Sequence, residues 1–172
     1  MFFEPSTRTM CSFETAINKS NGKYIKFIES SSSIKKGESL YDTIKTMESY
    51  CDLLIIRHPM YGIMEKIKSY INIPLINAGD GSGEHPTQAL LDLYTIKKNV
   101  SKFESILFVG DNKNSRTIKS LIKLLRICYP KLNYYFLSIN GLEYENNDIE
   151  ENYINIITSY DECVSQVDVI YM

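Results

Sequence analysis

The chain has 172 residues, of which 44% are hydrophobic and 23% are charged, a composition typical of globular proteins and unlike that of disordered ones. Its 19 basic and 21 acidic residues nearly cancel to a formal charge of -2, which argues against a dedicated nucleic-acid-binding protein. No apolar run approaches the roughly 20 residues of a membrane-spanning helix, and no signal-peptide pattern is visible. We therefore expect neither nucleic acid nor a membrane as a partner.

The cysteines and histidines show no metal-binding spacing. The four cysteines are far apart in the sequence, and no C-x2-C pair occurs. Both histidines, His58 and His85, are followed by proline, so no H-x3-H pair exists either. We expect no bound metal, and free thiols that suit a reducing, cytoplasmic location.

Short apolar runs alternate with helical patterns along the chain. Apolar residues at spacings of three and four predict helices that begin near Met10, Leu40, Gln88 and Ile118. Continuous apolar runs predict strands buried on both faces at residues 53–56, 74–77, 106–109, 134–137 and 167–171. This alternation predicts an α/β protein, with a parallel sheet and flanking helices.

Polar residues 97–102 separate a predicted helix from a new strand, so we expect two domains, at 1–100 and 101–172. Both ends of the chain are apolar, with one expected strand starting at Met1 and another running to the final residues. Native domains tend to end in exposed segments. We therefore expect the chain to be a fragment or a truncated gene product.

Two polar clusters suit an anion. Arg57 follows strand 53–56, and ligands of open α/β sheets bind beyond the carboxyl ends of the strands. The other cluster directly precedes a predicted helix, where backbone N–H groups point outward, and consists of Ser6, Thr7, Arg8 and Thr9. Taken alone, these residues also fit a Ser/Thr helix cap beside solvated arginines.

Two further loops follow predicted strands. A glycine-rich loop leads to His85 at a helix start, where the imidazole should stay uncharged and use its N–H to polarise a carbonyl. A structural histidine is the alternative. The other loop carries Arg116, a further candidate for binding an anion. This loop lacks both G-x-G-x-x-G and G-x4-G-K-[ST], which leaves only weak support for a nucleotide-binding domain.

Two long motifs in register resemble the aspartate/ornithine carbamoyltransferase family. The first is Phe3-Glu4-Pro5-Ser6-Thr7-Arg8-Thr9 with Ser12-Phe13-Glu14, and the second is His85-Pro86-Thr87-Gln88 with the helix that follows to Ile96. Residues 35–39 and 57–59 also fall in family order. The resemblance covers almost the whole chain and is densest over residues 1–96.

The resemblance implies a carbamoyl phosphate-binding domain that lacks its first helix, followed by an incomplete aspartate-binding domain. Thr87 after His-Pro, and Lys36 in the middle loop, favour aspartate over ornithine as the acceptor. The implied reaction moves the carbamoyl group of carbamoyl phosphate to the amine of L-aspartate, giving N-carbamoyl-L-aspartate and phosphate in pyrimidine biosynthesis. It needs no cofactor.

The resemblance also implies residue roles. The phosphate is bound by Ser6, Thr7, Arg8, Thr9 and Arg57. Thr9, Arg57 and His85 face the carbonyl oxygen, and Gln88 faces the carbamoyl amide. Lys36 and Arg116 bind aspartate, and the implied catalytic set is Arg8, Thr9, Lys36, Arg57 and His85.

Three implied roles concern other parts of the assembly. Ser32 (or Ser33) and Lys36 reach into the active site of a neighbouring subunit, which implies a homotrimer with shared active sites. Glu4 matches a residue that pairs with arginines across the two domains. Family members continue with an arginine–glutamine segment and a His-Pro-Leu-Pro-Arg loop that this sequence lacks, so we expect the chain to be inactive alone. A non-catalytic anion-binding protein and an ornithine carbamoyltransferase are the alternatives.

Overall fold

A computed structural model describes residues 1–145 and 149–172. The chain divides into two compact units, Met1–His85 and Pro86–Met172, each with its own hydrophobic core. This division falls between residues 85 and 86, whereas the sequence predicts a domain boundary at residue 100, after the helix Pro86–Asn99. The expected boundary stays a prediction. In the described part of the chain, no helix is both long and apolar enough to cross a membrane.

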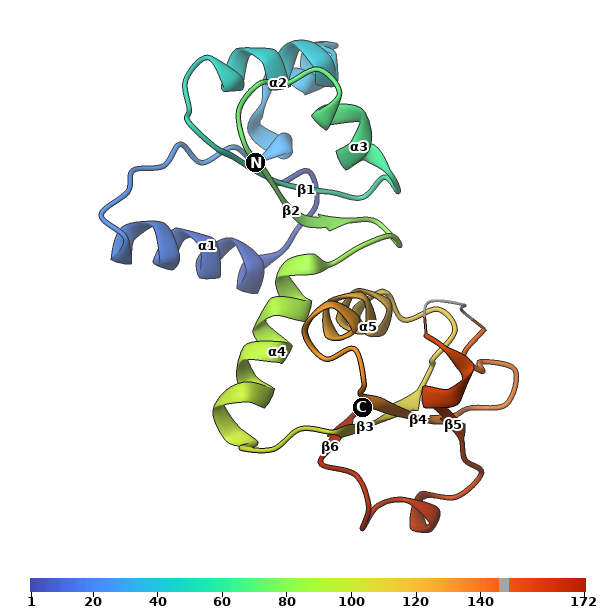
Figure 1. Cartoon of the computed structure of the whole chain (residues 1–172). Coiled ribbons are helices and arrows are strands. Elements are labelled where there is room, and N and C mark those ends of the chain that lie inside the picture. Colours follow the sequence, from blue (N-terminus) through green and yellow to red (C-terminus); the bar gives the residue numbers. More distant parts are fainter. Residues whose placement is uncertain (146–148) are drawn as a thin grey trace. The chain divides into compact units, whose positions relative to one another are not determined.

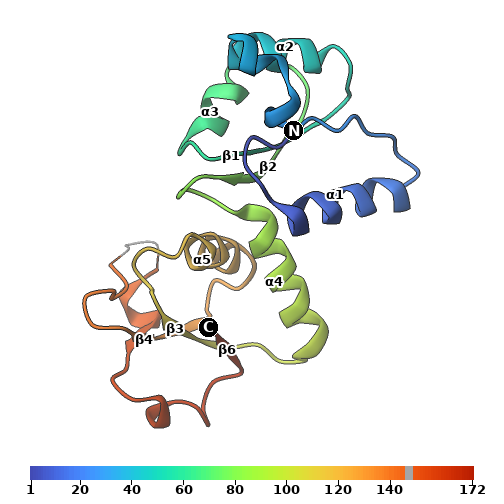
Figure 2. The same cartoon turned by 180° about the vertical axis from the view of Figure 1, so that it is seen from behind.

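The first unit is built on two parallel strands. Strands β1 (Leu54–His58) and β2 (Leu75–Asp80) pair in parallel, and Phe2 bridges to Arg57 on the neighbouring strand. Helices α2 (Leu40–Glu48) and α3 (Ile63–Lys68) lie on one side of these strands, and α1 (Thr7–Lys19) lies on the other (Figures 1 and 2). Two short 3-10 turns, Glu29–Ser31 and Ser33–Lys36, precede α2.

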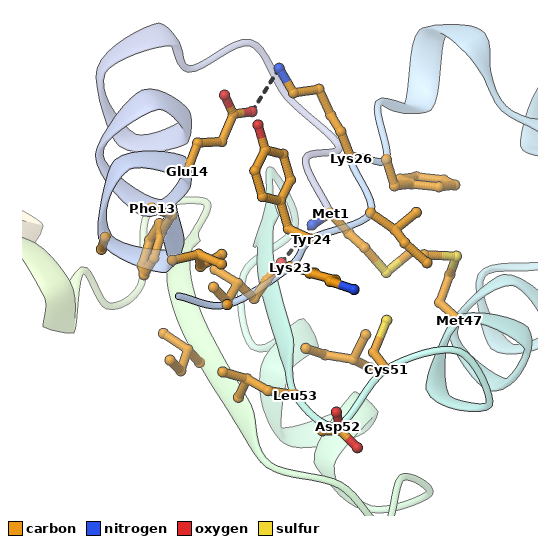
Figure 3. A pocket seen from close by; sticks show the side chains of 18 of the residues that line it. Met1, Phe13, Glu14, Lys23, Tyr24, Lys26, Met47, Cys51, Asp52 and Leu53 are labelled. Carbon is orange, nitrogen blue, oxygen red and sulfur yellow. Dashed lines mark hydrogen bonds and ion pairs between the residues drawn. The ribbon is translucent and has the colours of Figure 1, made fainter. Parts of the chain in front are cut away.

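The core of the first unit lies between the strands and two of the helices. Ile44 of α2 and Ile67 of α3 are fully buried against Ile56 of β1. Helix α1 has no buried residue, and its apolar side, with Phe13, borders a cavity of about 880 Å³ (Figure 3). The side chains that line this cavity are mostly apolar, so the cavity is not suited to binding a small anion.

The second unit is a four-stranded parallel sheet in the order β5-β4-β3-β6. Its elements in chain order are α4 (Pro86–Asn99), β3 (Ser105–Gly110), α5 (Arg116–Cys128), β4 (Asn133–Ser138), β5 (Ile154–Ile156) and β6 (Val169–Tyr171), with 3-10 turns at Glu151–Tyr153 and Tyr160–Glu162. Helices α4 and α5 share one buried cluster with β3 and β4, which includes Leu93, Leu121 and Phe108. This cluster is the core of the unit.

The parallel α/β architecture predicted from the alternation of patterns is confirmed. The expectation of strands buried on both faces holds for β3, but it is wrong for β1, β4, β6 and the first half of β2, where residues 75–77 are only half-buried. In β4, Tyr134 and Phe136 are buried in the core while Tyr135 and Leu137 are half-buried, because α4 and α5 pack on one face of the sheet. The sequence patterns do not predict helix α3 or strand β5.

Candidate functional site

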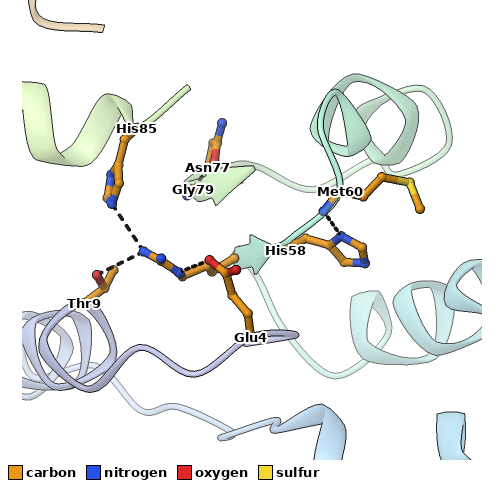
Figure 4. A network of polar contacts seen from close by, with 8 residues as sticks. Glu4, Thr9, His58, Met60, Asn77, Gly79 and His85 are labelled. Atoms are coloured by element: carbon orange, nitrogen blue, oxygen red, sulfur yellow. Dashed lines mark hydrogen bonds and ion pairs between the residues drawn. The ribbon is translucent and has the colours of Figure 1, made fainter. Parts of the chain in front are cut away.

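Arg57, near the carboxyl end of β1, is the centre of a polar network (Figure 4). Its Nε donates to Glu4 Oε1 at 2.6 Å, and its Nη1 donates to Thr9 Oγ1 at 3.5 Å and to His85 Nε2 at 3.3 Å. The side chain of Arg57 is only 12% exposed, so these contacts are made largely away from bulk water. Four segments of the first unit thus meet at one guanidinium group.

The amino-terminal segment reaches this point because it runs parallel to β1. The N–H of Phe3 donates to the carbonyl of Arg57 at 2.9 Å, and the N–H of Arg57 donates to the carbonyl of Met1 at 3.0 Å. The segment therefore ends beside the carboxyl end of β1, where Glu4 pairs with Arg57 and α1 begins. This is the edge at which ligands bind in open α/β sheets.

The first turn of α1 presents unused hydrogen-bonding capacity next to this network. Ser6 is the N-cap residue of α1, yet its hydroxyl makes no capping hydrogen bond. By contrast, the Ser39 hydroxyl caps α2 by accepting from the N–H of Asp42 at 3.1 Å. The N–H groups of a first helical turn have no acceptor within the helix and carry a partial positive charge. The start of α1 can therefore bind an anion.

The carboxyl end of β2 approaches Arg57 closely. Asn77 Oδ1 accepts from the N–H of Gly79 at 2.7 Å, and Gly79 has a φ of 126°. A Cβ at Gly79 would lie 3.4 Å from Arg57 Nη1. That distance is an ordinary van der Waals contact, so glycine is favoured here because an L side chain would be strained at this φ.

The contact between Arg57 and His85 defines the state of the imidazole. His85 is only 7% exposed. A guanidinium group can only donate, so His85 Nε2 accepts and a neutral ring carries its proton on Nδ1. The nitrogen that faces Arg57 is an acceptor in this contact, whereas an N–H is expected there from the sequence, and the role expected for His85 stays a prediction.

His58, the neighbour of Arg57, has a structural environment. Its Nδ1 accepts from the N–H of Met60 at 2.9 Å, and its ring centroid lies 5.0 Å from that of Phe3. Burial lowers the pKa of His58 below its usual 6.5, against the opposing charges of Glu29 and Glu4. The ring is therefore stabilised in its neutral form as part of the packing at the end of β1.

The remaining predicted site residues lie in other elements. Ser32 Oγ donates to the carbonyl of Glu29 at 2.8 Å, and Lys36 is exposed at the end of its 3-10 turn. Gln88 and Arg116 belong to the second unit. Gln88 lies on α4, where its Nε2 donates to Asp92 Oδ1 at 2.8 Å, and Arg116 is the first residue of α5. The roles implied for these residues stay predictions.

Sequence reasoning misses how two acidic residues are used. Glu4 pairs with Arg57 inside the first unit, a contact that sequence reasoning does not predict, and the pairing with arginines across the domains that is expected for Glu4 stays a prediction. The sequence does contain a hint of the pair between Glu4 and Arg57. Phe3 and strand 53–56 are both apolar, and each is followed directly by a charged residue, so two such segments that lie side by side in parallel bring these charges together. The other residue is Asp80, a buried carboxylate at the end of β2, for which the sequence predicts no role.

The geometry defines a class of protein. An arginine, an imidazole, a hydroxyl group and the start of a helix lie together at the carboxyl edge of a parallel sheet. Such an arrangement is typical of α/β proteins that bind a small anionic ligand. A sequence model described as "Aspartate/ornithine carbamoyltransferase, carbamoyl-P binding domain" matches residues 1–98, more than half of the chain. The chain belongs to the aspartate/ornithine carbamoyltransferase family.

Individual relatives agree with this membership. The aspartate carbamoyltransferase catalytic subunit of Archaeoglobus fulgidus is 44% identical over 176 residues, covering all of this chain and 58% of that protein. The structure of Trypanosoma cruzi aspartate transcarbamoylase with carbamoyl phosphate and aspartate matches at a TM-score of 0.87 and 36% identity, covering 99% of this chain and 61% of that one. The catalytic subunit of M. jannaschii aspartate transcarbamoylase matches at a TM-score of 0.85 and 41% identity, covering 99% and 58%. The chain thus spans about three fifths of the length of these relatives.

Proposed function

We propose that this chain forms the carbamoyl phosphate site, and part of the aspartate site, of an aspartate carbamoyltransferase. The observation that carries the proposal is the convergence of Thr9 and His85 on Arg57, beside the start of α1. A phosphate group matches the N–H groups of a first helical turn and the guanidinium of an arginine. The carbamoyl phosphate complex of the Trypanosoma cruzi relative supports this choice of ligand.

In the proposed complex, the phosphate lies at the start of α1. Ser6, Thr7 and Arg8 contribute their N–H groups and side chains, and Arg57 adds a guanidinium that Glu4 holds in place. The carbamoyl carbonyl oxygen faces Thr9, Arg57 and His85. Thr9 and Arg57 are donors that are already in place and do not have to reorganise when charge develops on that oxygen, and His85 holds Arg57 through its accepting Nε2.

The chemical step is attack by the aspartate amine on the carbamoyl carbon. A C–N bond forms and negative charge builds on the carbonyl oxygen. The C–O bond to phosphate then breaks, and the amine transfers a proton to the departing phosphate. The substrate supplies the nucleophile, so the residues of the chain position the reactants and stabilise charge. One well-placed oxyanion donor lowers the barrier by about 3–4 kcal/mol.

The remaining predicted residues complete the proposal. Gln88 binds the carbamoyl amide, Arg116 binds a carboxylate of aspartate, and Ser32 and Lys36 act in the active site of a neighbouring subunit in a homotrimer. Lys36 is exposed, as a residue that reaches another subunit must be. Aspartate is favoured over ornithine as the acceptor because the Archaeoglobus fulgidus and Trypanosoma cruzi relatives are named as aspartate enzymes. A cytoplasmic location and pyrimidine biosynthesis follow from the same proposal.

Isothermal titration calorimetry tests the ligand, with carbamoyl phosphate, inorganic phosphate, ATP and NAD titrated separately into the 172-residue chain. We expect carbamoyl phosphate to bind more tightly than inorganic phosphate, and ATP and NAD not to bind. A parallel assay for carbamoyl-aspartate measures turnover, which we expect to be absent. Binding without turnover is also what a non-catalytic anion-binding protein would show, and turnover with ornithine would contradict the choice of acceptor.

A further inference from the structure

A buried carboxylate closes the loop that carries His85. Asp80 is the last residue of β2 and is 5% exposed. Its Oδ1 accepts from the N–H of Glu84 at 2.6 Å, and its own N–H donates to the carbonyl of Glu84 at 3.4 Å. The backbone of Glu84 is thus held from two sides, and His85 is the next residue in the chain.

The rest of the loop is packed so closely that it has little freedom. The N–H of Gly81 donates to the carbonyl of His58 at 2.8 Å, and a Cβ at Gly81 would lie 2.2 Å from the carbonyl oxygen of Pro59. The N–H of Gly83 donates to the carbonyl of Asp80 at 3.0 Å. The loop is therefore held by backbone contacts with the end of β1 on one side and with Asp80 on the other. These contacts together fix the position of Glu84.

We propose that Asp80 is a positioning residue that places His85 Nε2 against Arg57. The carboxylate contacts the amide of Glu84 and acts on the imidazole through the backbone. Its effect on substrate rests on the proposed function, since it requires that His85 contacts the carbamoyl group. Its effect on the position of the imidazole does not depend on that function.

Three variants separate positioning from a general loss of stability. Asp80→Ala removes the acceptor, whereas Asp80→Asn keeps an Oδ1 that can accept from the N–H of Glu84. Asp168→Ala is the matched control, because Asp168 Oδ2 also accepts from backbone, from the N–H groups of Glu104 at 2.9 Å and Ser105 at 3.0 Å, but in the second unit. All three variants are made in the 172-residue chain.

The first measurement is side-chain NMR of the imidazole nitrogens. The chain has two histidines, so a His58→Gln variant assigns both sets of signals. We expect Asp80→Ala to shift the His85 signals, and Asp80→Asn and Asp168→Ala to leave them in place. Unchanged His85 signals in Asp80→Ala, or an equal shift in Asp168→Ala, would overturn the proposal.

A measurement on the unmodified chain guards against a variant that does not fold. If Asp80 Oδ1 holds the amide of Glu84, this amide exchanges with solvent slowly, as a hydrogen-bonded amide of the core does. Exchange at the rate of an exposed loop amide overturns the proposal without any substitution.

The second measurement compares two ligands by calorimetry. In Asp80→Ala we expect the preference for carbamoyl phosphate over inorganic phosphate to fall on the order of tenfold, the loss expected for one hydrogen bond to a ligand. A preference equal to that of the unmodified chain would contradict the link between Asp80 and substrate. If the unmodified chain shows no preference, the proposed function fails, while the NMR result still decides whether Asp80 positions His85.

Discussion

The two units use the carboxyl ends of their parallel strands differently. In the first unit, Arg57 at the end of β1 binds Glu4, Thr9 and His85, which lie 53, 48 and 28 residues away in the sequence. In the second unit, Asn112 follows β3 and donates to Ser138 Oγ at the end of β4 at 2.8 Å, a contact between residues 26 apart in the sequence. Both units thus join their strand ends by long-range contacts, but a charged guanidinium is the centre only of the network around Arg57, whereas Asn112 and Ser138 are neutral.

The hydrophobic core is built on a larger sheet in the second unit than in the first. The second unit has a four-stranded sheet in which Phe108 lies 5.6 Å, centroid to centroid, from both Phe136 and Tyr171. The first unit has two paired strands and a helix, α1, with no buried residue. We therefore expect substitutions in the second unit's core to lower stability without changing phosphate binding, and substitutions around Arg57 to weaken phosphate binding.

The largest expected effect on stability is at Phe108, which is fully buried. Phe108→Ala removes an aromatic ring from a packed core, and we expect it to lower the free energy of unfolding by about 3–5 kcal/mol. Urea unfolding measures this change, with Ile127→Ala as the control because Ile127 is 81% exposed on α5. If folded Phe108→Ala bound phosphate more weakly, this would contradict the expectation that the core of the second unit does not affect phosphate binding.

The next effect compares two glycines with a positive φ in the first unit. Gly81 has a φ of 58° and Gly62 one of 72°, so alanine is strained at both. A Cβ at Gly81 also meets the Pro59 carbonyl oxygen at 2.2 Å, whereas a Cβ at Gly62 meets nothing within 4 Å. We expect Gly62→Ala to cost about 1–2 kcal/mol, and Gly81→Ala to cost more and to weaken phosphate binding.

Equal unfolding free energies for Gly81→Ala and Gly62→Ala, measured in urea, would show that the loop after β2 moves to accommodate an added Cβ at little energetic cost. It could not then hold His85 firmly against Arg57.

A pair of helix caps gives a smaller effect. Ser39→Ala removes a capping hydrogen bond from α2, and we expect a loss of about 1 kcal/mol in stability with phosphate affinity unchanged. Ser6→Ala removes no capping bond, so we expect less loss of stability but weaker phosphate binding. Urea unfolding and calorimetry on both variants give the comparison. If Ser6→Ala binds phosphate normally, Ser6 is not part of the anion site.

The smallest effect is a dependence of stability on pH through His58. Burial lowers the pKa of His58 in the folded state, so the unfolded chain binds this proton more readily. The stabilisation from the neutral ring is complete above the unfolded pKa of 6.5 and is lost as pH falls through the lowered folded value. We expect His58→Gln to flatten this part of the pH dependence in urea unfolding, and an unchanged slope would contradict the assignment.

Sequence reasoning reaches the fold and the convergence of Arg57 and His85 because both depend on simple patterns. Apolar runs that alternate with helical periods predict parallel strands, and the carboxyl ends of such strands share an edge. Residues in the segments that follow strands 53–56 and 74–77 are therefore expected near one another, and these segments contain Arg57 and His85. The structure places Arg57 and His85 in hydrogen-bonding contact at that edge.

Other features have no such pattern. Helix α3 has only six residues and β5 only three, too few for a period to be visible. The orientation of the His85 ring depends on Arg57 Nη1, a contact 28 residues away, and no local signal gives it. In the sequence, Asp80 is one more polar residue of a glycine-rich loop, because its burial depends on how that loop folds onto β1.

Arg57 is the centre of the polar network, and its removal is the most direct test. Calorimetry with carbamoyl phosphate compares Arg57→Ala with Arg126→Ala, a substitution of an exposed arginine on α5. Loss of two charge-assisted hydrogen bonds amounts to at least about 3 kcal/mol, so we expect Arg57→Ala to weaken binding by roughly 100-fold or more. Arg126→Ala should bind as the unmodified chain does. A folded Arg57→Ala chain with unchanged affinity would contradict the proposed site.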